Sequence, residues 1–95
     1  MTGKQRAYLR GLANNLEPLM QIGKERLTQG QIQQLQLLLE YHELVKINIL
    51  RNADTDTKEA AEALRAATGA EIIQQIGNKL VLYRQSKEHQ TIRLP

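Results

Sequence analysis

The sequence predicts a single α/β domain with a four-stranded mixed sheet, in the order helix, strand, helix, strand, helix, strand, strand. Three observations predict this fold. Helix-start patterns precede apolar residues at helical spacing, short runs rich in Val, Ile and Leu alternate with those helices, and a Gly-Asn pair separates the last two runs as in a β-hairpin. With 95 residues and no internal repeat, we expect one domain, with a core at 2–84 and a polar tail at 85–95.

The first helix is expected to begin at Thr2, because Thr2 and Gln5 form the Thr-x-x-Gln pattern of a capping box. Apolar residues then recur on one side of about three turns. They are Tyr8, Leu9, Leu12 and Leu16. Pro18 disfavours helix at the residue before it, so the segment 19–22 is predicted as a first, extended strand.

The second helix is expected over residues 29–42, because Thr28 and Gln31 repeat the capping-box pattern just before a leucine-rich run. The segment 44–50 is the clearest strand in the chain. Its branched residues alternate with Lys46 and Asn48, so one face of this strand should be covered and the other at least partly wet.

The third helix is expected to begin at Asp56, the first residue of an Asp-x-x-Glu pattern, and to end at Gly69. Strands at 71–76 and 79–84 follow, joined by a two-residue turn at Gly77 and Asn78. The strand-helix-strand units favour parallel pairing and the hairpin adds an antiparallel pair. We expect all three helices to pack on one face of this sheet.

Composition excludes several classes of protein. The chain has no cysteine, so it has neither disulfides nor thiolate metal sites, and a reducing compartment is consistent with that. No apolar run is long enough to cross a membrane, and the N-terminus lacks the apolar block of a signal peptide. We therefore expect a cytoplasmic protein with no membrane contact. We also expect a monomer, although no feature of the sequence shows the oligomeric state.

The net charge of +3 is unevenly distributed along the chain. Residues 1–26 carry five Lys or Arg against two Asp or Glu, residues 27–75 carry four against seven, and residues 76–95 carry four against one. If the fold brings the two basic ends together, one face becomes a footprint for a polyanion. Chance clustering on a solvated surface is the alternative.

The strongest candidate for a binding site is the connection that leads from the first strand into the second helix. Gly23 permits close approach of a ligand to the backbone, Lys24 and Arg26 supply cations, and the helix start at Thr28 directs unpaired N–H groups outward. Phosphate is the ligand that this arrangement favours. An ordinary surface turn is the alternative, because Gly-Lys turns before helices are common.

Residues for catalysis or metal binding are scarce. The only serine, Ser86, lies in the polar tail, and packing at a helix end explains His42. Glu40, His42 and Glu43 are spaced so that they spread around a helix, which does not suit a metal site. We expect no catalytic residue, no metal and no cofactor.

Six short motifs follow one another along the chain: T-G-K-Q-R-A-Y-L at 2–9, L-E-P at 16–18, I-G-K-x-x-L-T at 22–28, H-E-L-V-K at 42–46, A-T-G-A-E at 67–71 and I-G-N-K-L-V-L-Y-R at 76–84. In this order they resemble the CRM (chloroplast RNA splicing and ribosome maturation) domain family in its stand-alone, YhbY-like bacterial form. The resemblance implies an RNA-binding domain similar in fold to the C-terminal domain of translation initiation factor three. It also implies association with precursors of the large ribosomal subunit.

The family's RNA-contacting element is a G-x-x-G loop, which falls here on Gly23, Lys24, Glu25 and Arg26. The chain departs from that pattern because Arg26 stands where the family has its second glycine; arginine adds a cation but limits backbone approach. The RNA-binding track that we expect is completed by cations of the first helix and the last hairpin. These are Lys4, Arg6, Arg10, Lys79 and Arg84.

Two features of this hypothesis have alternatives. Tyr8 and Tyr83 are candidate platforms for base stacking, but partial burial with a wet hydroxyl is the favoured explanation for both. The protein as a whole, instead of binding ribosomal RNA, could be an interaction module that docks a ribosomal or other protein through a sheet edge or the wet sheet face. DNA binding is disfavoured because no pair of helices has a recognition-helix pattern.

Overall fold

The computed structural model describes residues 1–23, 27–50 and 57–95. Within these ranges the predicted order of elements is confirmed. The helices are α1 (Gly3–Ala13), α2 (Gln29–His42) and α3 (Thr57–Thr68), and the strands are β1 (Met20–Ile22), β2 (Leu44–Ile49), β3 (Glu71–Ile76) and β4 (Lys79–Tyr83). The predicted start of the third helix at Asp56 lies outside the described residues.

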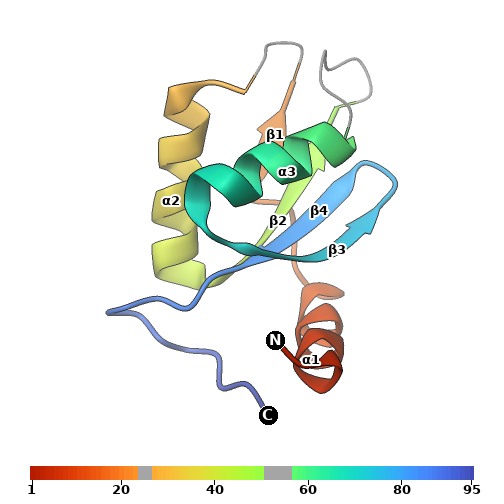
Figure 1. The fold of residues 1–95 in the computed structure, drawn as a ribbon, viewed down its shortest axis with the longest axis vertical. Coiled ribbons are helices and arrows are strands. Elements are labelled where there is room, and N and C mark those ends of the chain that lie inside the picture. Colours follow the sequence, from red (N-terminus) through yellow and green to blue (C-terminus); the bar gives the residue numbers. More distant parts are fainter. Residues whose placement is uncertain (24–26, 51–56) are drawn as a thin grey trace.

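The four strands form one mixed sheet in the order β1-β2-β4-β3, with α2 and α3 lying against it (Figure 1). β1 pairs with β2 in parallel, while β4 pairs in antiparallel fashion with both of its neighbours. β4 therefore separates β2 from β3, and the hairpin that it makes with β3 completes the sheet. A register shift between Ile72 and Gln74 marks an irregularity in β3.

The two faces of the sheet carry separate apolar clusters, because side chains alternate along each strand. Val45 and Ile47 of β2 face α2 and α3, together with Leu80 and Leu82 of β4. Leu44 belongs to a second cluster, which contains Leu9 and Ala13 of α1 as well as Ile73, Val81 and Tyr83.

The prediction that all three helices cover one face is therefore wrong for α1. That helix packs on the face opposite α2 and α3, where it covers the start of β2 and leaves the end of β2 open. The physical reason is that Leu44, Val81 and Tyr83 project from this face and need an apolar cover, which sequence periodicity does not assign to a particular helix. The expected partly wet face is the uncovered remainder.

The predicted capping boxes and glycine turns are present in the structure. Both capping boxes form: the Thr2 hydroxyl accepts from Gln5 N at 3.1 Å, and the Thr28 hydroxyl accepts from Gln31 N at 3.1 Å. Gly69 ends α3 with a φ of 73°, and Gly77 starts the hairpin turn with a φ of 57°. Both values lie in the left-handed region that glycine adopts at little cost.

The C-terminal tail adds no strand but is attached to the domain. The carboxylate of Glu43, which is completely buried, accepts hydrogen bonds from the backbone N–H groups of Ser86, Thr91 and Ile92 at 2.9, 2.7 and 3.0 Å. At the far end of the tail, the Gln5 amide donates to the Pro95 carbonyl at 3.2 Å. The two ends of the chain consequently lie near each other beside α1 (Figure 1).

None of the described helices has both the length and the apolar character needed to cross a bilayer.

Candidate nucleic-acid interface

Gly23 lies at the end of β1, beside the end of β2. Ile22 pairs with Ile49, and the Leu50 N–H donates to the Ile22 carbonyl at 2.9 Å, so the parallel strands finish together. Among the described residues, a Cβ added at Gly23 would meet only Leu50 Cδ1, at 3.5 Å, which is an ordinary van der Waals distance. Gly23 has no positive φ. Neither crowding by described residues nor backbone conformation explains why glycine occupies this position.

The same end of the domain holds the start of α2. Thr28 caps this helix in extended conformation, and residues 29 and 30 in its first turn are exposed. The N–H groups of a first turn have no intrahelical acceptors and carry partial positive charge. Lys24, Glu25 and Arg26, which were predicted to contact RNA, lie between these two described segments and outside the described residues.

Lys79 lies one strand further along this end of the sheet. The hairpin turn is held against β2 because the Ile49 N–H donates to the Asn78 carbonyl at 2.7 Å. Asn48 Oδ1 accepts from Asn78 Nδ2 at 3.0 Å and from Lys79 Nζ at 3.4 Å. Gly23, the end of β2 and the hairpin turn are thus neighbours at one end of the sheet. Below, Gly23 and the capped start of α2 at Thr28 are together called the Gly23 junction.

Two of the predicted cations are arginines whose guanidinium groups each make at least two hydrogen bonds to other elements. Arg84 donates from Nη1 to Gln36 Oε1 at 2.6 Å and to the Thr68 carbonyl at 2.8 Å, which ties β4 to α2 and to the end of α3. Arg6 donates to the Ile72 carbonyl at 2.7 Å and pairs with Glu71 at 3.0 Å, which ties α1 to β3. Both guanidinium groups therefore hold elements together.

Lys4 and Arg10 are exposed on α1 and form no ion pair with any described residue. Because α1 packs on the face opposite α2 and α3, these two cations share a side with Lys79 and not with Arg84. The structure does not collect all predicted cations in one track. It brings together the basic ends of the chain at α1 and the tail, where Arg93 is also exposed.

The two tyrosines proposed for base stacking differ in exposure. Tyr83 is only 6% exposed and packs in the cluster with Leu9 and Ala13, so it offers no open face to a base. Its burial, together with the negative charge of Glu43, raises the pKa of the Tyr83 hydroxyl. Tyr8 is 43% exposed.

Sequence reasoning missed the role of Glu43 and gave Lys46 no role in binding. From the sequence, Glu43 was considered as a metal ligand that helix geometry does not suit. A carboxylate placed between an apolar helix and an apolar strand, next to His42 in a family motif, was the signal that could have indicated its structural role. Glu40 is similarly engaged, since Ser86 Oγ donates to Glu40 Oε1 at 2.8 Å. Lys46 could have been noticed as a cation in the middle of an otherwise apolar strand.

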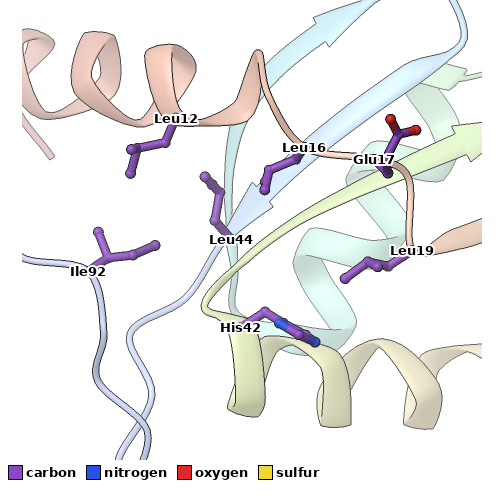
Figure 2. Close-up of a pocket in the computed structure, with 7 residues that line it drawn as sticks. All are labelled: Leu12, Leu16, Glu17, Leu19, His42, Leu44 and Ile92. Atoms are coloured by element: carbon purple, nitrogen blue, oxygen red, sulfur yellow. The ribbon is translucent and has the colours of Figure 1, made fainter.

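An apolar groove of about 420 Å³ opens between α1, the end of α2 and the tail. Figure 2 shows side chains from these elements converging on one space. The groove is lined by Leu12, Leu16, Glu17, Leu19, His42, Leu44 and Ile92. Leu12 and Leu19 are 37% and 44% exposed. It lies at the opposite end of β2 from Leu50, so it is separate from the Gly23 junction.

The amino-acid sequence is similar to a known protein family and to named bacterial proteins. The sequence model of the CRS1 / YhbY (CRM) domain matches residues 1–84. The chain is 41% identical over its whole length to a Bacillus subtilis protein named "Probable RNA-binding protein YqeI", covering 99% of it. It is 38% identical over its whole length to a Haemophilus influenzae protein named "RNA-binding protein", covering 95% of it.

A solved structure has the same fold. The solution structure of the protein SAV1595 from Staphylococcus aureus superposes with a TM-score of 0.82 and is 47% identical in sequence. The match covers 100% of this chain and 99% of that protein.

Proposed function

The chain belongs to the CRS1 / YhbY (CRM) domain family, and we propose that it is a non-enzymatic protein that binds RNA through the Gly23 junction. Its RNA would be the precursor of large-subunit ribosomal RNA, bound during ribosome assembly in the cytoplasm by a monomer of this chain. Support for the RNA comes from the names of the relatives, and support for the ribosomal target comes from the family resemblance.

The observation that carries this proposal is a glycine at position 23 that the described part of the fold does not require. Glycine there is required neither by a positive φ nor by a described neighbour closer than 3.5 Å, so a ligand that must approach the backbone accounts for it. The first turn of α2 offers N–H groups at the same end of the domain. Lys24 and Arg26 follow Gly23 in sequence and would neutralise phosphates.

The remaining predicted residues divide by their contacts. Lys79, with Arg10 and Lys4 on α1, would extend the phosphate-binding surface from the Gly23 junction, because the described structure leaves these cations without ion pairs. Glu25 stays within the proposed loop. We leave Arg6 and Arg84 out of the surface, because their guanidinium groups already bond to other elements.

The proposal is tested by measuring affinity for labelled precursor ribosomal RNA over a range of salt concentrations. Replacing Lys24 and Arg26 together with Ala should weaken binding, and it should reduce the slope of log affinity against log salt by roughly 0.7 for each lost single-strand contact. Lys87→Ala is the matched control, because Lys87 is an exposed cation of the tail. An unchanged slope in the folded double variant would remove the loop from the interface.

The apolar groove favours a second function, docking of a ribosomal or other protein. Leu12 and Leu19 expose apolar surface there, which a protein partner could cover. Association with ribosomal particles that survives nuclease and high salt, and that a Leu19→Ser variant loses, would favour this function. Loss of association after nuclease treatment favours RNA.

A further inference from the structure

A second cavity, of about 400 Å³, lies on the uncovered part of the α1 side of the sheet. It is lined by Asn14, Lys46, Gln74, Ile76, Gly77, Asn78, Lys79 and Val81. None of these residues is acidic. Two lysines, three side-chain amides and two apolar side chains therefore surround one hollow; below, this is the sheet-face pocket.

The register of the sheet explains why these side chains share a face. Lys46 pairs with Val81 and Asn48 pairs with Lys79, so all four project to the side that α1 only partly covers. Lys46 and Lys79 are diagonal neighbours on adjacent strands, and by standard sheet geometry their Cα atoms lie about 7–8 Å apart. Two lysine side chains therefore project from neighbouring positions on the same face of the sheet.

The irregularity in β3 contributes a third strand to the pocket. Ile72 pairs with Leu82, which faces α2 and α3, whereas Gln74 pairs with Val81, which faces the opposite side. Regular alternation would place residues 72 and 74 on the same face. The register shift turns Gln74 into the pocket, as expected of a bulge that redirects a side chain.

Two of the residues that line this pocket contribute little to the stability of the fold. Lys46 forms no ion pair with a described residue, and Ile76 is 64% exposed although it lies in a strand. Asn48 bonds to both Asn78 and Lys79, which orders two of the polar groups before any ligand arrives. Polar groups held in place beside an exposed apolar surface are typical of ligand sites.

The pocket adjoins the Gly23 junction. The Leu50 N–H bonds to the Ile22 carbonyl and the Ile49 N–H bonds to the Asn78 carbonyl, so the hairpin turn and the end of β1 flank the end of β2. An RNA strand bound at the junction would therefore reach Lys79 by crossing the end of β2. Asn14 lines the pocket together with Lys79. Arg10 lies one helical turn before Asn14, and its carbonyl accepts a hydrogen bond from the Asn14 N–H at 3.2 Å.

We propose that the sheet-face pocket binds an unpaired nucleotide of the RNA that contacts the Gly23 junction. Lys46 and Lys79 would hold its phosphates, Ile76, which is 64% exposed, would contact the face of the base, and the amides of Asn14, Gln74 and Asn78 would bond to its edge. This inference rests on the proposed RNA-binding function and adds to it a preference for RNA with unpaired nucleotides.

Side-chain amide signals of the ¹⁵N-labelled protein test the pocket directly. The probe is an RNA stem-loop with unpaired loop nucleotides, and the control is the same stem as a blunt duplex. We expect the stem-loop to shift the side-chain NH₂ signals of Asn14, Gln74 and Asn78 together with the backbone signal of Gly23, all with one dissociation constant. The duplex should leave the three side-chain signals in place.

A variant adds an affinity measurement. Lys46→Gln should weaken binding of the stem-loop roughly fivefold at about 0.1 M salt, the effect of one lost single-strand phosphate contact. Lys87→Gln removes the same charge from the tail and should leave affinity unchanged. The titration of the side-chain amide signals uses the wild-type protein, so it still tests whether the pocket binds RNA if Lys46→Gln fails to fold.

The outcomes separate the two proposals. If the Gly23 signal moves while the three side-chain amides do not, the sheet-face pocket is not a nucleotide site and the RNA-binding function stands. Equal shifts with the blunt duplex would overturn the preference for unpaired nucleotides. If no signal moves with either RNA, both proposals fail.

Discussion

The Glu43 carboxylate accepts a 2.7 Å hydrogen bond from the backbone N–H of Thr91, 48 residues further along the chain. This contact joins the end of α2 to the C-terminal tail. Glu43 has a φ of 65°, the only positive φ among the described residues other than glycine. Such backbone strain costs about 1–3 kcal/mol, and the hydrogen bonds to Ser86, Thr91 and Ile92 offset it.

We predict that Glu43→Gln lowers the free energy of unfolding by about 3 kcal/mol, because an amide leaves one of several buried N–H donors without its charged acceptor. Denaturant unfolding measures this change. Glu88→Gln is the control, since it neutralises an exposed carboxylate of the tail. A Glu43→Gln protein as stable as the wild type would show that the hydrogen bonds between Glu43 and the tail do not stabilise the fold.

The pH dependence of stability should reveal the same carboxylate. Burial raises the pKa of Glu43, but the hydrogen bonds from Ser86, Ile92 and Thr91 outweigh it and hold the pKa below its ordinary value of 4.5. A lowered pKa in the folded state stabilises the protein fully above pH 4.5, and that stabilisation is lost as the pH falls through the folded pKa. Unfolding curves between pH 7 and about pH 2 should show this loss in the wild type. The loss should be smaller in Glu43→Gln.

Arg84 should matter for stability more than for RNA. Its hydrogen bonds to Gln36 and to the Thr68 carbonyl are charge-assisted, so Arg84→Ala should lower the free energy of unfolding by about 1.5–3 kcal/mol. Arg84→Lys should recover little, because an ammonium cannot reproduce the planar fork. RNA affinity, measured below the unfolding transition, should remain within about twofold of wild type. A larger loss in folded protein would return Arg84 to the interface.

The ion pair between Arg6 and Glu71 should contribute little to stability. Their side chains are 36% and 53% exposed, and exposed pairs contribute about 0–1 kcal/mol. Glu71→Gln should therefore change the free energy of unfolding by less than about 1 kcal/mol. Arg6→Ala should cost more, since it also removes the hydrogen bond to the Ile72 carbonyl that holds α1 on β3. Equal effects of the two substitutions would argue that the ion pair dominates.

Gly23→Ala separates binding from folding. An added Cβ meets Leu50 Cδ1 at 3.5 Å, so the fold should tolerate it and the unfolding midpoint should change little. RNA affinity should nevertheless fall, because the methyl group would stand between the backbone and a phosphate. Gly3→Ala is the matched control, since a Cβ there meets no atom of the described residues within 4 Å. Retained affinity in Gly23→Ala would show that the backbone at this junction does not touch RNA.

The order of the elements, the capping boxes at Thr2 and Thr28 and the turns at Gly69 and Gly77 followed from sequence alone, because capping, turn formation and alternation depend on residues close together in the chain. The family could also be recognised, since its motifs are short and ordered.

Only the tertiary structure decided what depends on distant residues. In the folded protein α1 lies on the face opposite α2 and α3, and Arg84 and Arg6 form hydrogen bonds that join separate elements. The tail covers Glu43, and a shift of register in β3 places Gln74 on the same face as Lys46. A cation in sequence carries no sign of whether an acceptor many residues away will bind it. That outcome is set by packing and long-range hydrogen bonds, which exist only once the chain has folded.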